Sequence, residues 1–135
     1  MPKIDIRKIW SLNYRLMTSV ISEVSPALDE LGLETKELFV LAEVDEHPHP
    51  AELAGVLCIP KPTITLYLKR LTAAGLLNRE IDATDLRRHR LLLTAQGRKT
   101  MTRGLALLEN AFALRLGRLT ATQQAELGTL LEKLS

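Results

Sequence analysis

Residues 50–75 read PAELAGVLCIPKPTITLYLKRLTAAG, and proline and glycine punctuate this stretch more clearly than any other part of the chain. Pro50 suits the first turn of a short helix, and the segment 58–60 breaks that helix. A second helix is predicted over 61–74 and ends at Gly75. Its buried face is predicted from apolar residues at spacings of four and three, which are Ile64, Leu68 and Leu71.

After Gly75 the spacing of the apolar residues changes from that of a helix to that of two short strands. The runs 76–81 and 90–94 are separated by a polar stretch that carries arginines, which predicts a β-hairpin with a long loop. Thr94 then suits the N-cap of a long helix over 95–119. The order helix, turn, helix and hairpin predicts a winged helix-turn-helix, a mainly α fold of the α+β class.

Helices are also predicted before this central segment. Residues 6–31 carry apolar side chains at three- and four-residue intervals, and Gly32 is expected to end that helix. Pro26 lies inside it and is expected to kink or divide it, because proline removes an amide donor. A further helix is expected over 36–46, directly after Thr35.

The last helix of the chain is expected to begin after Thr120 or Thr122, either of which can cap it. One face of this helix is apolar and consists of Leu127, Leu130, Leu131 and Leu134. The apolar stripes of the first and last helices could form an internal core or the interface of a homodimer. A short chain has little else to cover two such helices, so we expect a homodimer.

Charge is distributed very unevenly along the chain. The 135 residues carry 18 Lys plus Arg and 16 Asp plus Glu, which gives a net charge of only +2. Residues 61–103 hold ten of the basic and three of the acidic residues, or +7, whereas the rest holds 8 basic and 13 acidic residues, or −5. A local basic patch is typical of a phosphate-binding surface, although a basic run can also be a solvated face.

The composition disfavours several other classes of protein. An apolar content of 46% over 135 residues fits one globular domain with a real core. The single Cys58 excludes a disulfide framework, no apolar run reaches the length of a membrane span, and no signal-peptide core follows the N-terminus. We therefore expect a soluble, cytoplasmic protein.

The sequence also lacks the motifs of an enzyme. It contains no glycine-rich phosphate loop and no nucleophile motif, so we expect neither catalysis nor a cofactor. Glu43, Asp45, His47 and His49 lie close together in the sequence but offer too few well-spaced ligands for a metal. This segment is interpreted as a polar loop.

Three stretches of the sequence resemble the MarR-type transcriptional regulators. Residues 52–65 are similar to the helix-turn-helix of that family. LTAAGLLNR at 71–79 is similar to its "L-x-x-x-G-hydrophobic-hydrophobic-x-R" exit from the recognition helix. DLRR at 85–88, followed by LLLTAQG at 91–97, is similar to the wing signature "D-x-R" and then "L-T-x-x-G". The likeness covers nearly the whole chain, since long flanking helices form the dimerisation region of the family.

The resemblance implies a DNA-binding surface on the second helix of the motif and on the hairpin loop. The start of that helix is expected to meet base edges or phosphates in the major groove, and its lysines to meet the backbone. Arg87 is expected in the minor groove, and Asp85 is expected to hold the wing by pairing with a nearby arginine. The predicted DNA-binding residues are Lys61, Pro62, Thr63, Thr65, Leu66, Lys69, Arg70, Asp85, Arg87, Arg88 and Arg90.

Two residues depart from the pattern of the family. Leu66 stands where members often carry an arginine, so it could contact a thymine methyl group or simply pack. Cys58 stands where glycine is common in the turn, and a positive φ there would strain it. We interpret Cys58 as an inert, buried side chain rather than a redox sensor, because the sensing cysteines of relatives typically lie in the first helix region.

The resemblance also implies an effector pocket between the dimerisation helices and the DNA-binding lobe. Its candidate residues are Trp10, Asn13, Tyr14 and Met17, although core packing explains the apolar ones equally well.

We therefore predict a homodimeric repressor that binds double-stranded DNA at a pseudo-palindromic operator and is released by a small aromatic effector. Residues 1–33 and 99–135 are assigned to dimerisation and 34–98 to the winged helix-turn-helix, with the recognition helix near 61–74 and the wing near 82–90. The alternative is a winged-helix protein-interaction module without a DNA site. The charge of +7 disfavours it, because interaction faces are depleted in charge at their core.

Overall fold

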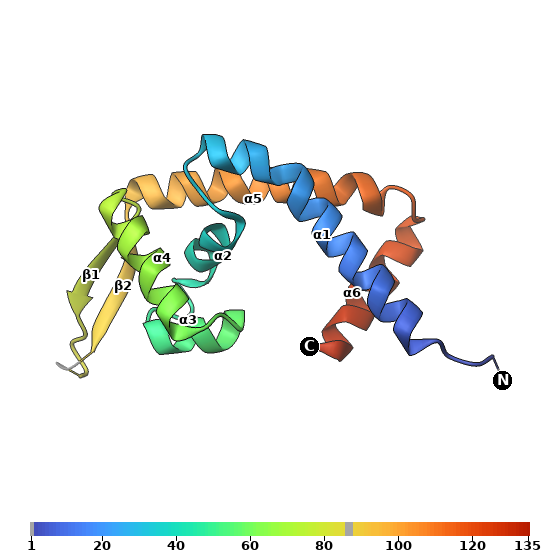
Figure 1. Cartoon of the computed structure of the whole chain (residues 1–135), viewed down its shortest axis with the longest axis horizontal. Coiled ribbons are helices and arrows are strands. Elements are labelled where there is room, and N and C mark those ends of the chain that lie inside the picture. Colours follow the sequence, from blue (N-terminus) through green and yellow to red (C-terminus); the bar gives the residue numbers. More distant parts are fainter. Residues whose placement is uncertain (1, 86–87) are drawn as a thin grey trace. The chain divides into compact units, whose positions relative to one another are not determined.

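The computed structural model describes residues 2–85 and 88–135, and within them it contains six helices and one two-stranded sheet (Figure 1). The elements in chain order are α1 (Ile6–Glu30), α2 (Thr35–Glu43), α3 (Pro50–Leu57), α4 (Lys61–Ala73), β1 (Leu77–Ile81), β2 (His89–Leu93), α5 (Ala95–Leu116) and α6 (Ala121–Leu134). This order confirms the predicted mainly α winged helix-turn-helix.

The chain divides into two compact units. The terminal unit comprises Met1–Val24 and Ala106–Ser135, and the central unit comprises Ser25–Leu105. The end of α1 and the first half of α5 therefore belong to the central unit. This unit extends beyond the predicted DNA-binding region 34–98 at both ends.

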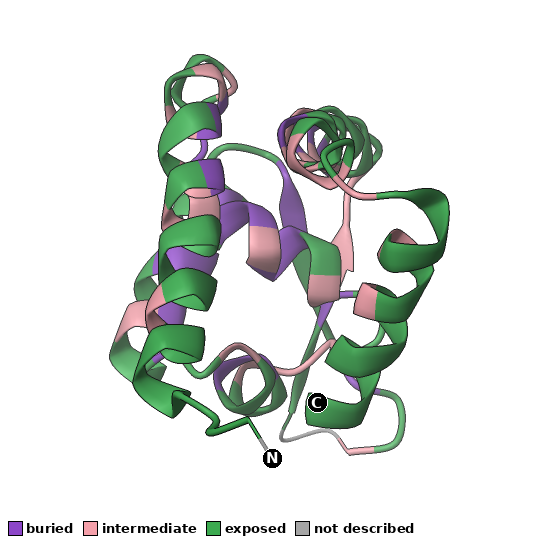
Figure 2. Ribbon diagram, turned by 90° about the vertical axis from the view of Figure 1, so that its right-hand side faces the viewer, coloured by how far each residue is buried: buried purple, intermediate pink, exposed green. Residues whose placement is uncertain are grey.

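The core of the central unit is apolar and is built from every element between the end of α1 and β2 (Figure 2). Burying a leucine or isoleucine side chain contributes roughly 1.5–3 kcal/mol, so these residues supply most of the stabilisation of the unit. The large apolar side chains that are at most 2% exposed are Leu28, Leu33, Leu38, Leu41, Leu53, Ile64, Leu68, Leu71, Leu77 and Leu91.

α1 runs without interruption through Pro26, so Pro26 does not divide this helix, and the alternative of a kink stays a prediction. A proline inside a helix costs about 3 kcal/mol. The side chains of Val24 and Leu28 on either side of it are buried, at roughly 1.5–3 kcal/mol each, which offsets that cost. Gly32 ends the helix as predicted, with a φ of 77°, and the amide of Leu33 donates to the carbonyl of Leu28 at 3.0 Å.

The helices of the helix-turn-helix begin and end at the residues that punctuate the sequence. Pro50 lies in the first turn of α3 and Pro62 in the first turn of α4. Gly75 follows α4 with a φ of 77°, as expected for a residue that ends a helix. α2 instead begins with a capping box of Glu34 and Glu37, and it ends at Glu43, earlier than predicted.

The hairpin leads directly into α5, and backbone and capping hydrogen bonds define both elements. β1 and β2 pair antiparallel, from Leu77 opposite Leu93 to Ile81 opposite His89. Thr94 caps α5 as predicted, since its hydroxyl accepts a bond from the amide of Gly97 at 2.8 Å. α5 ends at Leu116, three residues before the predicted end.

In the terminal unit, Thr120 rather than Thr122 caps α6, and Gln123 completes a capping box with it. Many large apolar side chains of this unit are exposed, namely Ile4, Ile6, Ile9, Trp10, Leu12, Tyr14, Leu16, Met17, Leu114, Leu130, Leu131 and Leu134. Among the described residues, no helix combines the length and the apolar character needed to cross a membrane.

Candidate nucleic-acid interface

α4 presents one packed face and one exposed face. Its inner residues Ile64, Leu68 and Leu71 are buried in the core of the central unit. The side chains that were predicted to meet DNA extend from the other side of the helix. Lys61, Pro62, Thr65, Leu66 and Lys69 are exposed, and Thr63 is half-buried. The structure therefore gathers the predicted residues of the recognition helix on its solvent side.

Two residues of this exposed face differ in what they can offer DNA. Leu66 is 52% exposed, so about half of its apolar surface is available to an apolar partner. The hydroxyl of Thr65 donates to the carbonyl of Lys61 at 3.0 Å. In this rotamer Thr65 can accept a further hydrogen bond, but its proton is not available to a phosphate oxygen.

The turn between α3 and α4 places Cys58 in the left-handed region, with φ 53° and ψ 42°. This confirms the expected positive φ at a position where glycine is favoured. The amide of Ile59 donates to the carbonyl of Ala54 at 3.1 Å and closes the turn. The thiol is exposed, so the interpretation of Cys58 as a buried side chain is wrong. Its position is set by the backbone of the turn rather than by packing.

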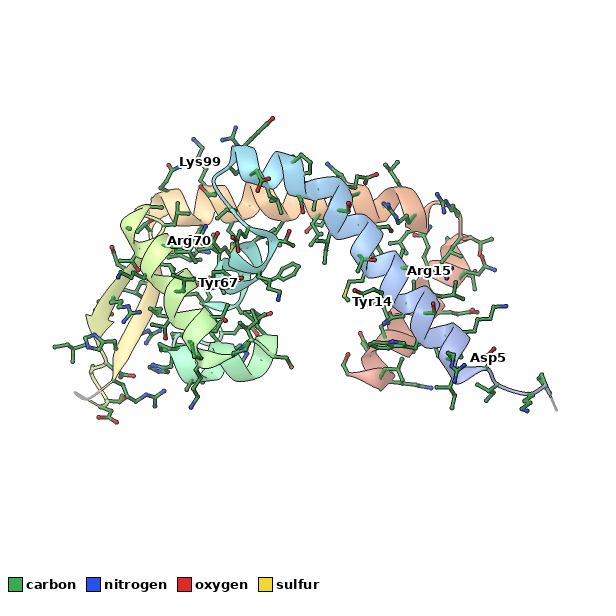
Figure 3. The ribbon with its side chains drawn as sticks, in the orientation of Figure 1. Asp5, Tyr14, Arg15, Tyr67, Arg70 and Lys99 are labelled. Carbon is green, nitrogen blue, oxygen red and sulfur yellow. The ribbon has the colours of Figure 1, made fainter. Side chains whose placement is uncertain are left out.

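Arg70 is joined to the start of α2. Its guanidinium lies 3.3 Å from Glu34 and 3.7 Å from the buried carboxylate of Glu37. Tyr67, one turn earlier on α4 (Figure 3), lies against the same acidic groups, and burial followed by the Glu34 charge raises the pKa of its phenol. Arg70 thus holds α4 on α2 within the central unit, and its predicted DNA contact stays a prediction.

The wing loop is shaped by a carboxylate that the sequence had not singled out. Asp82, directly after β1, is buried and accepts two hydrogen bonds from Thr84, from the hydroxyl at 2.6 Å and from the amide at 2.8 Å. The hydroxyl bond, followed by the amide bond, lowers the pKa of Asp82 below its ordinary value. The loop therefore begins with a fixed turn and a fixed negative charge.

Other bonds tie the hairpin to the segment before and within α3. The amide of Leu91 donates to the carbonyl of Pro48 at 2.8 Å. The guanidinium of Arg88 lies 3.2 Å from Glu52 of α3. His49 lies 3.2 Å from Asp82 through its Nε2. These contacts place the base of the wing relative to the helix-turn-helix.

The other residues of the wing that were predicted to contact DNA are Asp85, Arg87 and Arg90. Arg87, together with Leu86, lies outside the described residues. The carbonyl of Asp85 accepts a bond from the amide of Arg88 at 3.0 Å. Arg90 is exposed on β2, where it lies opposite Glu80.

Sequence reasoning missed the acidic residues and the histidine that position this surface. Glu34 has a local signal, because a glutamate follows it three residues later in the pattern of a capping box. Asp82 has a local partner as well, since Thr84 follows it two residues later. Glu52 and His49 have no comparable signal, because Arg88 and Asp82, which they contact, are distant in the sequence and are set by how the hairpin meets α3.

The acidic and histidine-bearing segment after α2 is divided among different partners. Asp45 pairs with Arg98 at 3.1 Å, and His49 pairs with Asp82 at 3.2 Å. Ligand atoms of Glu43, Glu46 and His47 lie within 4.8 Å of one another at the surface. Such clusters are common without an ion, and we assign no metal to this one.

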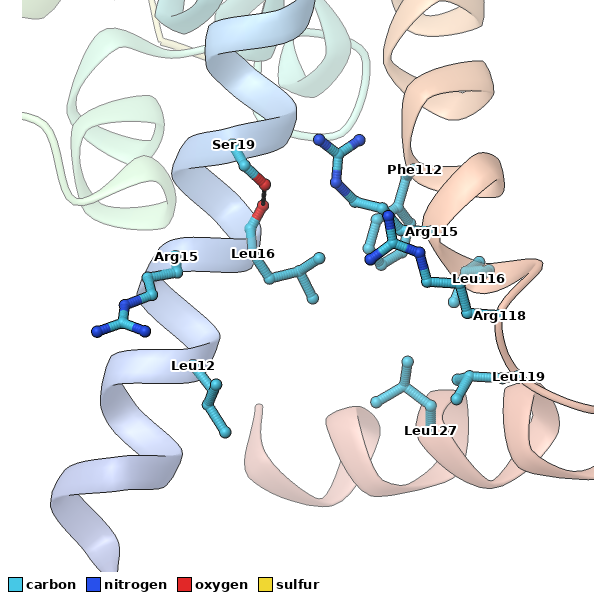
Figure 4. A pocket seen from close by; sticks show the side chains of 10 residues that line it. All are labelled: Leu12, Arg15, Leu16, Ser19, Phe112, Arg115, Leu116, Arg118, Leu119 and Leu127. Carbon is cyan, nitrogen blue, oxygen red and sulfur yellow. Dashed lines mark hydrogen bonds between the residues drawn. The ribbon is translucent and has the colours of Figure 1, made fainter.

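The terminal unit contains an open pocket of about 490 Å³ (Figure 4). Its walls are mostly apolar and consist of Leu12, Leu16, Phe112, Leu116, Leu119 and Leu127, with Arg15, Ser19, Arg115 and Arg118 beside them. Arg115 is held by Glu23 at 3.3 Å. The predicted effector residues of α1 are exposed and do not line this pocket of the described chain. Trp10 and Tyr14 lie beside each other, with ring centres 6.4 Å apart.

The chain is similar in sequence to a family of known proteins and to a repressor of that family. Residues 33–89 match the model of the MarR family. The HTH-type transcriptional repressor Rv2887 of Mycobacterium tuberculosis is 36% identical over 125 residues, which cover 91% of this chain and 90% of the relative.

Crystal structures of Rv2887 are also similar to this chain. Its complex with DNA has a TM-score of 0.78 at 33% identity and covers 98% of this chain and 99% of that one. Its complex with salicylic acid has a TM-score of 0.77 at 33% identity and covers 98% of each chain. The chain therefore belongs to the MarR family of winged helix-turn-helix transcriptional regulators, which are not enzymes.

Proposed function

We propose that this chain is a repressor that binds double-stranded DNA through the start of α4 and the loop between β1 and β2. The observation that carries the proposal is the exposed face of α4, where Lys61, Thr65, Leu66 and Lys69 extend from a helix whose other face is packed. In a helix-turn-helix these first turns reach base edges in the major groove. Because the inner face is fixed, the backbone of α4 loses little conformational entropy when the outer face binds.

The charges of the central unit support this proposal. Lys61, Lys69 and Arg90 form no ion pair with another residue of the described chain, so they are available to phosphates. Arg70 and Arg88 are paired within the protein. The pairs of Arg88 with Glu52 and of Arg70 with Glu34 are exposed, and such pairs are worth at most about 1 kcal/mol, so a phosphate can compete for these two contacts.

We further propose that Arg87 enters the minor groove. Its place in the sequence supports this, since it lies between the fixed turn at Asp82 and the start of β2. Narrow A·T-rich minor grooves concentrate negative potential and attract arginine.

The exposed apolar surface of the terminal unit supports a homodimer. Leu114, Leu130, Leu131 and Leu134 are all exposed, and an apolar surface of this kind marks an interface. A two-fold dimer would place two copies of α4 on a pseudo-palindromic operator, with half-sites about 34 Å apart.

Leu130→Glu combined with Leu131→Glu should convert the dimer to a monomer in analytical ultracentrifugation. Val56→Glu, an exposed position on α3, is the control that should stay dimeric.

A small aromatic acid is the proposed effector. Rv2887 has been crystallised with salicylic acid and with p-aminosalicylic acid. We propose that Trp10, Asn13, Tyr14 and Met17 take part in binding such a ligand in this chain, and that the ligand shifts the dimer away from its DNA-binding form. Salicylate should then raise the melting temperature of the protein and weaken its binding to DNA.

As a DNA-binding regulator, the chain is proposed to act in the cytoplasm.

An electrophoretic mobility shift series over salt concentration tests the DNA-binding function. Binding should weaken steeply as salt rises, because each phosphate contact releases counterions. If protein at about 1 μM leaves duplex DNA unshifted at low salt, the proposal is wrong. Arg87→Ala should weaken binding and leave the dimer intact, whereas Arg7→Ala in the terminal unit removes the same charge and should change little.

A further inference from the structure

The ring of His49 lies between two hydrogen-bond acceptors of the wing. Its Nδ1 is 3.2 Å from the carbonyl oxygen of His89, and its Nε2 is 3.2 Å from Oδ2 of Asp82. The side chains of His49 and Asp82 are only 13% and 11% exposed. A backbone carbonyl and an ionised carboxylate only accept hydrogen bonds, so both ring nitrogens must carry a proton to satisfy this arrangement.

Asp82 is held in its ionised form. Its other oxygen, Oδ1, accepts the hydroxyl and the amide of Thr84 at 2.6 Å and 2.8 Å. These two bonds lower the pKa of Asp82, and the charges of His49 and Arg88 lower it further against the opposing effect of burial. Asp82 therefore stays an acceptor throughout the pH range in which histidine titrates.

The elements around this ring carry further ionisable groups, which are Glu43, Glu46 and His47 at the end of α2, Glu52 on α3, and Glu80, Asp85, Arg88, His89 and Arg90 on the hairpin. The carboxylate of Glu52 is shared between Arg88 at 3.2 Å and His47 at 3.5 Å. Asp82 is therefore the carboxylate that faces the ring of His49.

Loss of one proton breaks this arrangement. A neutral imidazole has one proton and one lone pair, so it satisfies only one of the two acceptors. Its lone pair then faces either the carbonyl of His89 or the carboxylate of Asp82, and both contacts are repulsive. Asp82 follows β1 and His89 begins β2, so the lost bond is at one of the two ends of the wing loop.

We propose that His49 is a positioning residue for DNA binding, which holds the base of the wing in place only while its ring is doubly protonated. This inference rests on the proposed DNA-binding function and adds a dependence on pH. Affinity for DNA falls when the ring loses one proton, because one of its two bonds to the base of the wing is then lost. The ladder between β1 and β2 and the bond between Leu91 and Pro48 do not titrate, so the hairpin stays formed and stays attached to the segment before α3.

Binding across pH tests the proposal directly. The probe is a fluorescein-labelled duplex of about 30 base pairs, selected from a random pool by the wild-type protein at low pH. The Kd of the wild-type protein, followed by anisotropy, should rise about fivefold between about pH 6 and pH 8. His49→Gln keeps an amide donor and has no charge to lose, so its Kd should change less than about twofold over the same range.

Two matched variants separate His49 from the other histidines of this region. His47→Gln and His89→Gln should keep the pH dependence of the wild-type protein, because neither ring lies between Asp82 and the carbonyl of His89. A flat profile for wild-type protein that does bind DNA overturns the proposal. Full pH dependence in folded His49→Gln overturns it as well.

Nuclear magnetic resonance of the wild-type protein without DNA gives a second readout, which does not depend on any variant folding. The ¹⁵N shifts of the His49 ring should report two protonated nitrogens at low pH, and the amides of Thr84 and Arg90 should shift with the same midpoint as the ring. Amides that stay still while the ring titrates would show that the ring does not position the wing. Coupled amides without DNA binding at any pH would overturn the proposed DNA-binding function, while the protonation-dependent fixation of the wing stands.

Discussion

Gly97, in the first turn of α5, lies directly against the backbone carbonyl of Leu76, so that a Cβ atom at this position would overlap the carbonyl oxygen. Thr94 fixes this approach. Its amide donates to the same carbonyl at 3.1 Å, and its hydroxyl donates to the carbonyl of Gly75 at 2.7 Å and accepts the amide of Gly97 at 2.8 Å. The L-T-x-x-G pattern of the sequence therefore joins the start of α5 to the end of the helix-turn-helix.

Gly97→Ala is expected to lower the free energy of unfolding by about 1–3 kcal/mol, because the backbone must move to admit the methyl group. Gly55→Ala is the matched control, since a Cβ on this helical glycine meets nothing within 4 Å. It should raise the free energy of unfolding by up to about 1 kcal/mol. Urea denaturation measures both, and equal stabilities of the two variants would contradict the close approach at Gly97.

Cys58→Gly should raise the melting temperature, because a side chain in the left-handed region costs roughly 1–2 kcal/mol. The greater freedom of glycine in the unfolded chain removes about 0.4–1 kcal/mol of this gain. Cys58→Ala keeps the strain and should melt close to the wild-type protein. A glycine variant that melts below the alanine variant would show that the turn does not store this strain.

Lys69 and Arg70 are neighbours on α4 with different predicted roles. Lys69→Gln should reduce the slope of log K against log salt by about 1 and leave stability unchanged, as expected for a lost phosphate contact. Arg70→Gln should lower the free energy of unfolding by about 0.5–1 kcal/mol, through its pairs with Glu34 and Glu37, and change the slope less. If Arg70→Gln reduced the salt slope more than Lys69→Gln and left stability unchanged, Arg70 would be the residue that contacts DNA.

Thr84→Val removes the hydroxyl that contributes most to the lowered pKa of Asp82, so this pKa should rise towards the ordinary value of 3.8. A lowered pKa stabilises the folded state above the ordinary value, and this stabilisation is lost as pH falls through the folded-state pKa. Acid unfolding of the variant should therefore begin at a higher pH. Carboxyl ¹³C titration of Asp82 measures the shift. Thr72→Val is the control and should leave this pKa unchanged, because the hydroxyl of Thr72 donates to the carbonyl of Leu68 and not to Asp82.

The parts of the fold that the sequence predicted are those with local signals. Pro50, Pro62 and Gly75 mark the ends of α3 and α4 because each restricts the backbone at its own position. The continuity of α1 through Pro26 was not predictable in this way. It depends on the burial of Leu28, which is a property of the packed central unit.

The same distinction applies to the candidate site. The exposed face of α4 could be predicted because its apolar residues recur with the period of a helix, which leaves the remaining positions to solvent. The partners of Arg88 and His49 could not be predicted from spacing. They depend on the register of the hairpin and on where residues 48–52 meet it.

The bond between the amide of Leu91 and the carbonyl of Pro48 also limits strand addition at the edge of the hairpin. A free strand edge is a template on which another chain can add a strand. On the outer edge of β2, Pro48 occupies the amide of Leu91 and the ring of His49 occupies the carbonyl of His89. A proline and a side chain cannot continue a ladder of backbone bonds, so these two groups of β2 are not available to a strand from another molecule.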